Sequence, residues 1–186
     1  PAISRIGFDT PLDAPLLLAM GRLHENKAFD VLLRALAKLP DAWLWIAGEG
    51  PEAASLSKLA TELGVTDRVR FLGWRDDFDA LMQSCDMFVC SSRHEPLGNI
   101  VLEAWAAGKP VVAAAAAGPV SLIGDNVAGI LVPVDDPDGL ADGIRELLAD
   151  PANAARLAVE GRRRFEENYT EKAVVAQYQD FFERIA

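Results

Sequence analysis

Short, predominantly apolar runs alternate along this chain with stretches in which apolar residues recur at helical spacing. The apolar runs lie at residues 16–20, 43–48, 69–73, 87–92, 111–115 and 129–134. The helical stretches lie at residues 28–39, 51–63, 78–85, 101–108 and 137–185. Apolar strands that alternate with helices are typical of a parallel sheet covered on both faces. The alternation therefore predicts an α/β fold with a doubly wound, Rossmann-like parallel sheet.

The length of the chain limits the number of domains. A chain of 186 residues, 51% of them hydrophobic, has room for one domain with a substantial core. Its first residues contain several prolines and show little periodicity. We expect residues 1–15 to be the remnant of an interdomain linker. We expect residues 16–186 to form one domain, which includes C-terminal helices over 137–185.

The net charge of −10 excludes some classes of partner. Nucleic acids and anionic membranes require a basic surface, so neither is an expected partner. No apolar run reaches the roughly 18 residues of a membrane span, and the N-terminus lacks the pattern of a signal peptide. Cys85 and Cys90 match neither a zinc site nor a disulfide framework, and we expect them to be reduced thiols in the core. These features predict a cytoplasmic protein.

Unusual residues follow three of the expected strands. GRLHENKAFD follows the first strand, GEGP the second and SSRHEPLGN the fourth. Ligands of doubly wound sheets bind in the crevice outside the carboxyl ends of the strands. We therefore expect these three loops to lie along one edge and to form the binding site.

The first of these loops offers positive charge at the start of a helix. Gly21 leaves the strand without a side chain, and Arg22 and Lys27 bracket the helix start. The free N–H groups of a helix start favour an anion, and an Arg with a Lys would suit a diphosphate. The alternative is that both are solvated surface cations.

The second loop places Gly48 and Gly50 at a turn from strand to helix, with Pro51 in the favoured first helical position. Glycines allow a backbone to approach a ligand closely, although ordinary turns use them as well. Ala53 stands where the dinucleotide-binding fingerprint requires its third glycine. That fingerprint is therefore absent.

The third loop separates two glutamates, Glu95 and Glu103, by eight positions around a Pro-Leu-Gly turn. Apolar neighbours on both sides of Glu103 indicate a largely buried helix, in which an ionised carboxylate needs a partner such as ribose hydroxyls or an arginine. The alternative is a turn cap at Glu95 and a solvated Glu103. The N–H groups of Leu97, Gly98 and Asn99 are expected at the helix start, free to bind phosphate or sugar oxygens.

Together these segments resemble a known family. E-P-L-G-N-I-V-L-E at 95–103 is similar to the Glu-x7-Glu motif of retaining glycosyltransferases of the GT-B type, in particular family four, the glycosyl transferases group 1. G-R-L-x-x-x-K at 21–27 and G-x-G-P at 48–51 resemble further segments of that family in the same order. The resemblance runs from about residue 16 to the end. It implies the C-terminal, nucleotide-sugar-binding half of a GT-B fold.

The resemblance also implies a role for each candidate. Arg22, Lys27 and Glu95 would be catalytic: the two cations neutralise the diphosphate leaving group, and Glu95 contacts the hydroxyls of the donor sugar. Glu103 would bind the ribose. The other donor-binding positions are Gly21, Gly48, Gly50, Trp74, Leu97, Gly98 and Asn99. The family needs no divalent ion, so the resemblance implies no metal and no cofactor, and the nucleotide-diphosphate sugar is a substrate.

The sequence departs from the family in places. Ala28 stands where the family usually has glycine after the lysine, and a tighter helix start is the expected effect. The stretch AAAAAGP at 113–119 replaces a more polar loop, which leaves only backbone groups around Gly118 for sugar contacts. Trp74 follows the third strand, near the family's base pocket. Its ring would stack on the base or pack in the ordinary way.

The resemblance predicts the donor-binding domain of a retaining, hexosyltransferase-type enzyme that transfers a sugar from a nucleotide-diphosphate sugar to a glycan or glycolipid. The acceptor would be bound mostly by a missing N-terminal domain of the same polypeptide, so we expect this chain alone to be inactive. That domain would also provide any peripheral attachment to the inner membrane. Aromatic residues within 152–185 would contact it.

Two alternatives remain open at the level of the sequence. One is a nucleotide-sugar binding or regulatory module without turnover. The other is a different GT-B sugar enzyme, such as a nucleotide-sugar epimerase. The base (UDP, GDP or ADP), the sugar, the acceptor and the oligomeric state are not determined by the sequence.

Overall fold

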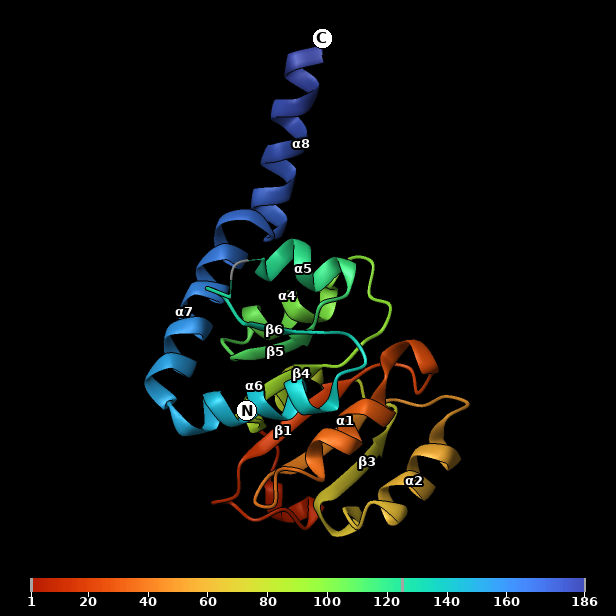
Figure 1. Ribbon diagram of the computed structural model, residues 1–186. Helices are drawn as coiled ribbons and strands as arrows, with labels where there is room; N and C mark the ends of the chain where they lie inside the picture. Colours follow the sequence, from red (N-terminus) through yellow and green to blue (C-terminus); the bar gives the residue numbers. More distant parts are fainter. Residues whose placement is uncertain (1, 125, 186) are drawn as a thin grey trace.

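The computed structural model describes residues 2–124 and 126–185. It contains a six-stranded parallel sheet in the order β3-β2-β1-β4-β5-β6 (Figure 1). The strands are β1 (Leu16–Met20), β2 (Trp43–Ala47), β3 (Val69–Gly73), β4 (Met87–Cys90), β5 (Val111–Ala114) and β6 (Ile130–Val132). The predicted α/β class and doubly wound parallel sheet are confirmed.

Helices cover both faces of the sheet. The core of one face contains α1 (Phe29–Leu36), α2 (Ala53–Glu62) and α6 (Pro137–Ala149). The core of the other face contains α3 (Phe78–Ser84), α4 (Asn99–Ala106) and α5 (Ala117–Ile123). Along β1, Leu17 and Ala19 belong to the first core, and Leu16 and Leu18 belong to the second. Burial on both faces explains why the inner strands β1, β2, β4 and β5 are apolar throughout, whereas the edge strand β3 contains Arg70 and an exposed Phe71.

The C-terminal part of the chain consists of two further helices. α7 (Pro151–Asn168) packs on α4, where a Cβ on Gly161 would lie 2.4 Å from the Trp105 ring. α8 (Glu171–Ile185) extends away from the rest of the molecule in Figure 1 and buries none of its described residues. Its large exposed apolar residues are Val175, Tyr178, Phe181, Phe182 and Ile185.

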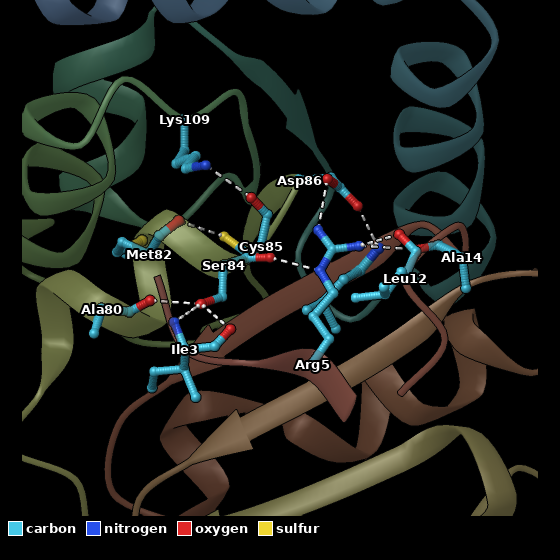
Figure 2. Close-up of polar contacts among 11 residues, drawn as sticks. Ile3, Arg5, Leu12, Ala14, Ala80, Met82, Ser84, Cys85, Asp86 and Lys109 are labelled. Atoms are coloured by element: carbon cyan, nitrogen blue, oxygen red, sulfur yellow. Dashed lines mark hydrogen bonds and ion pairs between the residues drawn. The ribbon is translucent and has the colours of Figure 1, made fainter. Parts of the chain in front are cut away.

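The segment before β1 packs against the domain. It contains a 3-10 helix at Arg5–Phe8. Figure 2 shows Arg5, whose Nη2 contacts Asp86 Oδ1 at 2.8 Å and whose Nε donates to the Ser84 carbonyl at 2.9 Å. The Ile3 N–H donates to Ser84 Oγ at 2.7 Å. These contacts fix the path of the segment, and its assignment as a linker remnant stays a prediction.

Some predicted boundaries differ from the structure. The helix expected from residue 51 begins at Ala53, because the Glu52 N–H donates to the Leu23 carbonyl and holds the preceding turn against another loop. The alanine-rich stretch read as a loop enters α5 at Ala117, with Pro119 in its first turn, where a missing N–H does no harm. Shorter 3-10 helices occur at Glu25–Lys27 and Thr66–Arg68. Among the helices of the described residues, none is long and apolar enough to cross a membrane.

Candidate functional site

The candidate site lies at the point where the order of the sheet reverses. β1 and β4 are neighbours, yet α1 and α4, the helices that follow them, pack on opposite faces. Such a switch point opens a crevice at the carboxyl ends of the strands. The Leu23 N–H donates to the Glu49 carbonyl at 2.9 Å, and the Arg93 N–H donates to the Asn26 carbonyl at 2.8 Å. The three predicted loops therefore contact one another along one edge, as expected.

The loop contacts require glycine at two of the predicted positions. Gly48 has φ 142°, and a Cβ there would lie 1.9 Å from the Gly21 carbonyl oxygen. A Cβ on Gly50 would lie 2.3 Å from the Leu23 carbonyl oxygen. The structure thus gives these glycines a packing role between loops, and their contact with a ligand stays a prediction.

Two candidate catalytic residues contact each other. Lys27 Nζ donates to Glu95 Oε2 at 2.5 Å, although the residues are 68 positions apart. The side chains are 26% and 12% exposed, so solvent screens this ion pair only partly. Ser91 Oγ also donates to the Lys27 carbonyl at 2.8 Å. The structure therefore brings together the positive end of the first loop and the carboxylate of the third.

Ala28, which replaces the glycine usual in the family, has an unusual backbone conformation. Its backbone is left-handed, with φ 51° and ψ 38°, between the 3-10 helix at Glu25–Lys27 and α1. A left-handed conformation costs a non-glycine residue about 1–2 kcal/mol. The position thus has the conformation that glycine adopts most easily, and a tighter start of the helix stays a prediction.

A cavity of about 500 Å³ reaches Gly21, where an added Cβ would lie 3.1 Å from Lys27 Cε, although neither Lys27 nor Glu95 lines the cavity itself. Of the predicted residues, Gly21, Arg22, Gly48, Trp74 and Glu103 line it. Arg22 is exposed, and within residues 2–124 and 126–185 its guanidinium has no hydrogen bond or ion pair. The cavity therefore presents an unpaired cation within reach of a ligand.

Glu103 differs from its prediction. It is exposed and lines the cavity, while its α4 neighbours Val101, Ala104 and Trp105 are buried. The expectation of a buried carboxylate was wrong because Glu103 projects from the face of α4 opposite to the core. The surrounding atoms still remove part of its water, which raises the pKa of Glu103, and the charge of Glu95 raises it further. In the described part of the chain its carboxylate has no hydrogen-bond donor.

Trp74 stands at the wall of the cavity with 68% of its surface exposed. Ordinary packing in the core is therefore excluded for this ring. Its stacking on a base stays a prediction. Arg75 lies beside it and also lines the cavity, held by Asp77 and placed over the Phe8 ring at 5.6 Å.

The turn before α4 is built by two glycines. Gly98 has φ 74°, and its missing side chain leaves room for Gly118, whose N–H donates to the Glu95 carbonyl at 2.7 Å. Leu97 is 70% exposed at the tip of the turn. The N–H groups of Leu97, Gly98 and Asn99 donate to no group among the described residues, as the helix start predicts.

Arg93, which lies in the third loop, is a further residue of the site that the sequence did not predict. Its guanidinium contacts the carboxylates of Asp30 and Asp135. Burial acts to raise the pKa of Asp30, but the hydrogen bonds and charge of Arg93 outweigh it and hold the pKa below its usual value. The only signal in the sequence was the place of Arg93 two positions before Glu95, because its partners are distant along the chain.

Other polar residues of these loops have structural partners. Asp136 caps α6 by accepting from the Gly139 N–H, and His24 accepts from the Asn26 N–H. Cys85 and Cys90 are buried free thiols, as expected, and burial raises the pKa of Cys85 to about 12. No group of three or more His, Cys, Asp or Glu residues in the described ranges is placed to hold a metal ion.

Comparison with known proteins places this geometry in a family. The family model for glycosyl transferases group 1 matches residues 4–170. The chain is 43% identical to the lipopolysaccharide core biosynthesis glycosyltransferase LpsE of Rhizobium meliloti over 95% of its own length and 52% of the relative. It is 38% identical to D-inositol 3-phosphate glycosyltransferase of Mycolicibacterium smegmatis, over 94% of this chain and 42% of that protein. The chain thus spans about half the length of the curated relatives it matches.

Solved structures give the same result. Sucrose-phosphate synthase from Thermosynechococcus elongatus has a TM-score of 0.86 at 31% identity, over 97% of this chain and 48% of that one. HepE from Anabaena, solved in complex with UDP, has a TM-score of 0.90 at 28% identity, over 97% of this chain and 51% of that one. The chain belongs to the glycosyl transferases group 1 and has the fold of one half of a GT-B glycosyltransferase.

Proposed function

We propose that this chain is the donor-binding domain of a retaining glycosyltransferase, which transfers a sugar from a nucleotide-diphosphate sugar to a glycan or glycolipid. The observation that carries the proposal is the Lys27–Glu95 pair beside a cavity lined by Arg22 and Glu103. This arrangement offers cations for a diphosphate and carboxylates for the hydroxyl groups on either side of it.

The volume and walls of the cavity suit a nucleoside. Ligand pockets commonly measure about 300–1,000 Å³, and the cavity of about 500 Å³ lies in that range. Trp74 would stack on the base, and Glu103 would accept hydrogen bonds from the ribose hydroxyls. The diphosphate would then reach Arg22 and Lys27, with the N–H groups of 97–99 beyond it.

In this arrangement the protein itself stabilises the leaving group. Negative charge grows on the diphosphate as the bond to the sugar breaks, and fixed cations at Arg22 and Lys27 would stabilise that charge. We therefore propose a reaction that needs neither a metal nor a cofactor. Glu95 would release Lys27 to the phosphate and bind the sugar hydroxyls.

The relatives support this proposal. HepE of Anabaena was solved with UDP and with UDP-glucose, and the relative LpsE is named for lipopolysaccharide core biosynthesis. Since the chain spans about half of such proteins, we propose that it binds the donor but transfers little sugar without the acceptor-binding domain. The complete protein would act in the cytoplasm, at the inner membrane surface.

The test is a thermal-shift series with UDP, GDP and ADP on the wild-type chain and on Lys27→Ala. A ligand at about 100 times its Kd adds about 2.7 kcal/mol of stability, which for a chain of this size corresponds to a Tm increase of about 5–10 °C. We expect one nucleotide to produce this increase in the wild type and Lys27→Ala to remove most of it.

The matched control is Lys58→Ala. Lys58 lies on α2 in a surface ion pair with Glu62, and its side chain is 79% exposed. This variant should respond to nucleotides like the wild type. Absence of any shift in the wild type, or an equal shift in Lys27→Ala, would contradict the proposed site.

A further inference from the structure

One arginine connects three loops at the edge of the sheet that carries the candidate site. Arg93 Nη1 and Nη2 donate to Asp30 Oδ1 and Oδ2 at 2.9 and 2.8 Å. Arg93 Nη1 also donates to the Glu25 carbonyl at 2.8 Å, and Arg93 Nε donates to Asp135 Oδ1 at 2.5 Å. The guanidinium thus has acceptors on all three of its nitrogens.

The acceptors come from different parts of the fold. Glu25 and Asp30 follow β1, Arg93 follows β4 and Asp135 follows β6. Asp135 has a left-handed backbone with φ 59°, which is unusual for a residue other than glycine. The side chain of Arg93 therefore joins segments that the sheet itself does not hold together beyond the ends of the strands.

The backbone around Arg93 continues this connection. The N–H groups of Arg93 and His94 both donate to the Asn26 carbonyl, at 2.8 and 3.2 Å. Asn26 precedes Lys27, and Glu95 follows His94 directly. A displacement of Arg93 would therefore shift the two residues of the ion pair relative to each other.

A direct role for Arg93 in binding phosphate is less favourable. Four of the five N–H donors of a guanidinium are used by the contacts to Asp30, Glu25 and Asp135. Two carboxylates also outweigh the one positive charge. The group is placed to hold the loops together and has little capacity left for a ligand.

We propose that Arg93 is a positioning residue. It holds Lys27 and Glu95 at the relative position in which they bind the phosphate and sugar end of the donor. The inference rests on the proposed function. A lysine could not replace this arginine, because one ammonium group lacks the planar fork that reaches Asp30 and Asp135 together. Loss of the contacts made by Arg93 should weaken binding of the phosphate end of the donor. Binding of the nucleoside in the cavity should change little.

The test compares the affinities for a nucleoside diphosphate and for the monophosphate of the same base. The base is the one that binds the wild type best in the series of UDP, GDP and ADP, and the affinities are measured by calorimetry. Loss of one hydrogen bond to a charged group weakens binding by about 10- to 100-fold. We expect Arg93→Ala to weaken diphosphate binding by about 10- to 100-fold and monophosphate binding by less than about 3-fold, and Arg93→Lys not to restore it.

The control variant is Arg145→Ala. Arg145 pairs with Asp142 on α6 and donates to the Lys38 carbonyl, after the end of α1 that lies away from the site. It should bind both nucleotides like the wild type. Circular dichroism on each variant checks that the fold is retained.

Three results would overturn the inference while leaving the proposed function intact. They are diphosphate binding by Arg93→Ala equal to the wild type, an equal loss for both nucleotides, and full recovery in Arg93→Lys. A wild-type chain that binds none of the nucleotides would instead overturn the proposed function, and the role of Arg93 with it.

Discussion

On one side of the candidate site Lys27 and Glu95 contact each other, whereas on the other side Arg22 and Glu103 face the cavity without a partner among the described residues. The paired side is also held by Arg93 through two further carboxylates. We refer to these as the clamped side and the open side.

The difference indicates a division of tasks. Groups held in place by several contacts lose little freedom when a ligand arrives, which favours accurate positioning of the reacting atoms. Unpaired charges on the open side have no internal contact to break before they bind. The clamped side is therefore suited to positioning the bond that reacts, and the open side, with Arg22 and Glu103, to contacts that form only when the donor binds.

The largest change in stability is expected for Gly48→Ala, which would disturb the clamped side and the open side together. The added Cβ would meet the Gly21 carbonyl oxygen at 1.9 Å in a backbone conformation that side chains rarely adopt. We expect the free energy of unfolding to fall by about 3–5 kcal/mol. Urea unfolding followed by circular dichroism measures this change.

Gly64→Ala is the control for that substitution. Gly64 also has a positive φ, 68°, but a Cβ there meets nothing within 4 Å. Its loss of stability should be about 1 kcal/mol, from backbone strain alone. Equal losses of stability for the two variants would mean that the close approach of Gly21 and Gly48 does not determine the cost of Gly48→Ala.

A smaller change is expected on the clamped side for Asp30→Asn. At pH 7 the free energy of unfolding should fall by about 0.5–1 kcal/mol, because the partly exposed ion pair with Arg93 is lost. The pKa of Asp30 lies below its usual 3.8 in the folded state. The stabilisation is therefore present above pH 3.8 and is lost as the pH falls through the folded pKa.

The measurement is unfolding of wild type and variant from pH 7 down to acid, with Asp142→Asn as the control at a more exposed pair. The difference between wild type and Asp30→Asn should shrink below pH 3.8. A difference that stayed constant with pH would show that the charge of Asp30 is not responsible.

The smallest change in stability is expected on the open side for Glu103→Gln, and it has the opposite sign. The pKa of Glu103 is raised above 4.5, so the folded state is favoured below pH 4.5 and loses this contribution as the pH rises through the folded pKa. The variant should thus be slightly more stable than the wild type at pH 7, by less than about 0.5 kcal/mol.

The same variant should bind nucleotide about tenfold more weakly, because hydrogen bonds from ribose hydroxyls to a charged acceptor are stronger than those to a neutral one. Calorimetry and unfolding on one preparation measure both effects. Glu62→Gln on α2 provides an exposed control. A variant that is less stable at pH 7 and binds normally would remove Glu103 from the site.

Much of the fold could be predicted from the sequence, because strands buried on both faces are apolar throughout and are easy to recognise. The three loops could be placed at one edge for the same reason, since parallel strands end together. The sequence therefore predicts one site that contains both Lys27 and Glu95, and their side chains contact each other in the structure.

The features that the sequence did not predict depend on contacts between distant residues or on local conformation. Arg93 lies 63 positions from Asp30 and 42 from Asp135, and no periodic pattern relates them. The orientation of Glu103 depends on which face of α4 packs on the sheet. The residues around Glu103 in the sequence are all apolar, so no amphipathic pattern indicates that face. The left-handed conformation at Ala28 is not indicated by the alanine itself, because alanine is common in helices; the family's usual glycine at this position is the only indication.

The central place of β1 in the sheet has a consequence for how the chain folds during synthesis. β2 can pair with β1, and β3 with β2, as soon as each has been made, but the other edge of β1 waits for β4. Until then an apolar strand has an open edge, and such edges favour aggregation. Because the loops after β1 and β4 are also where Lys27 meets Glu95, we expect the site to form late in folding.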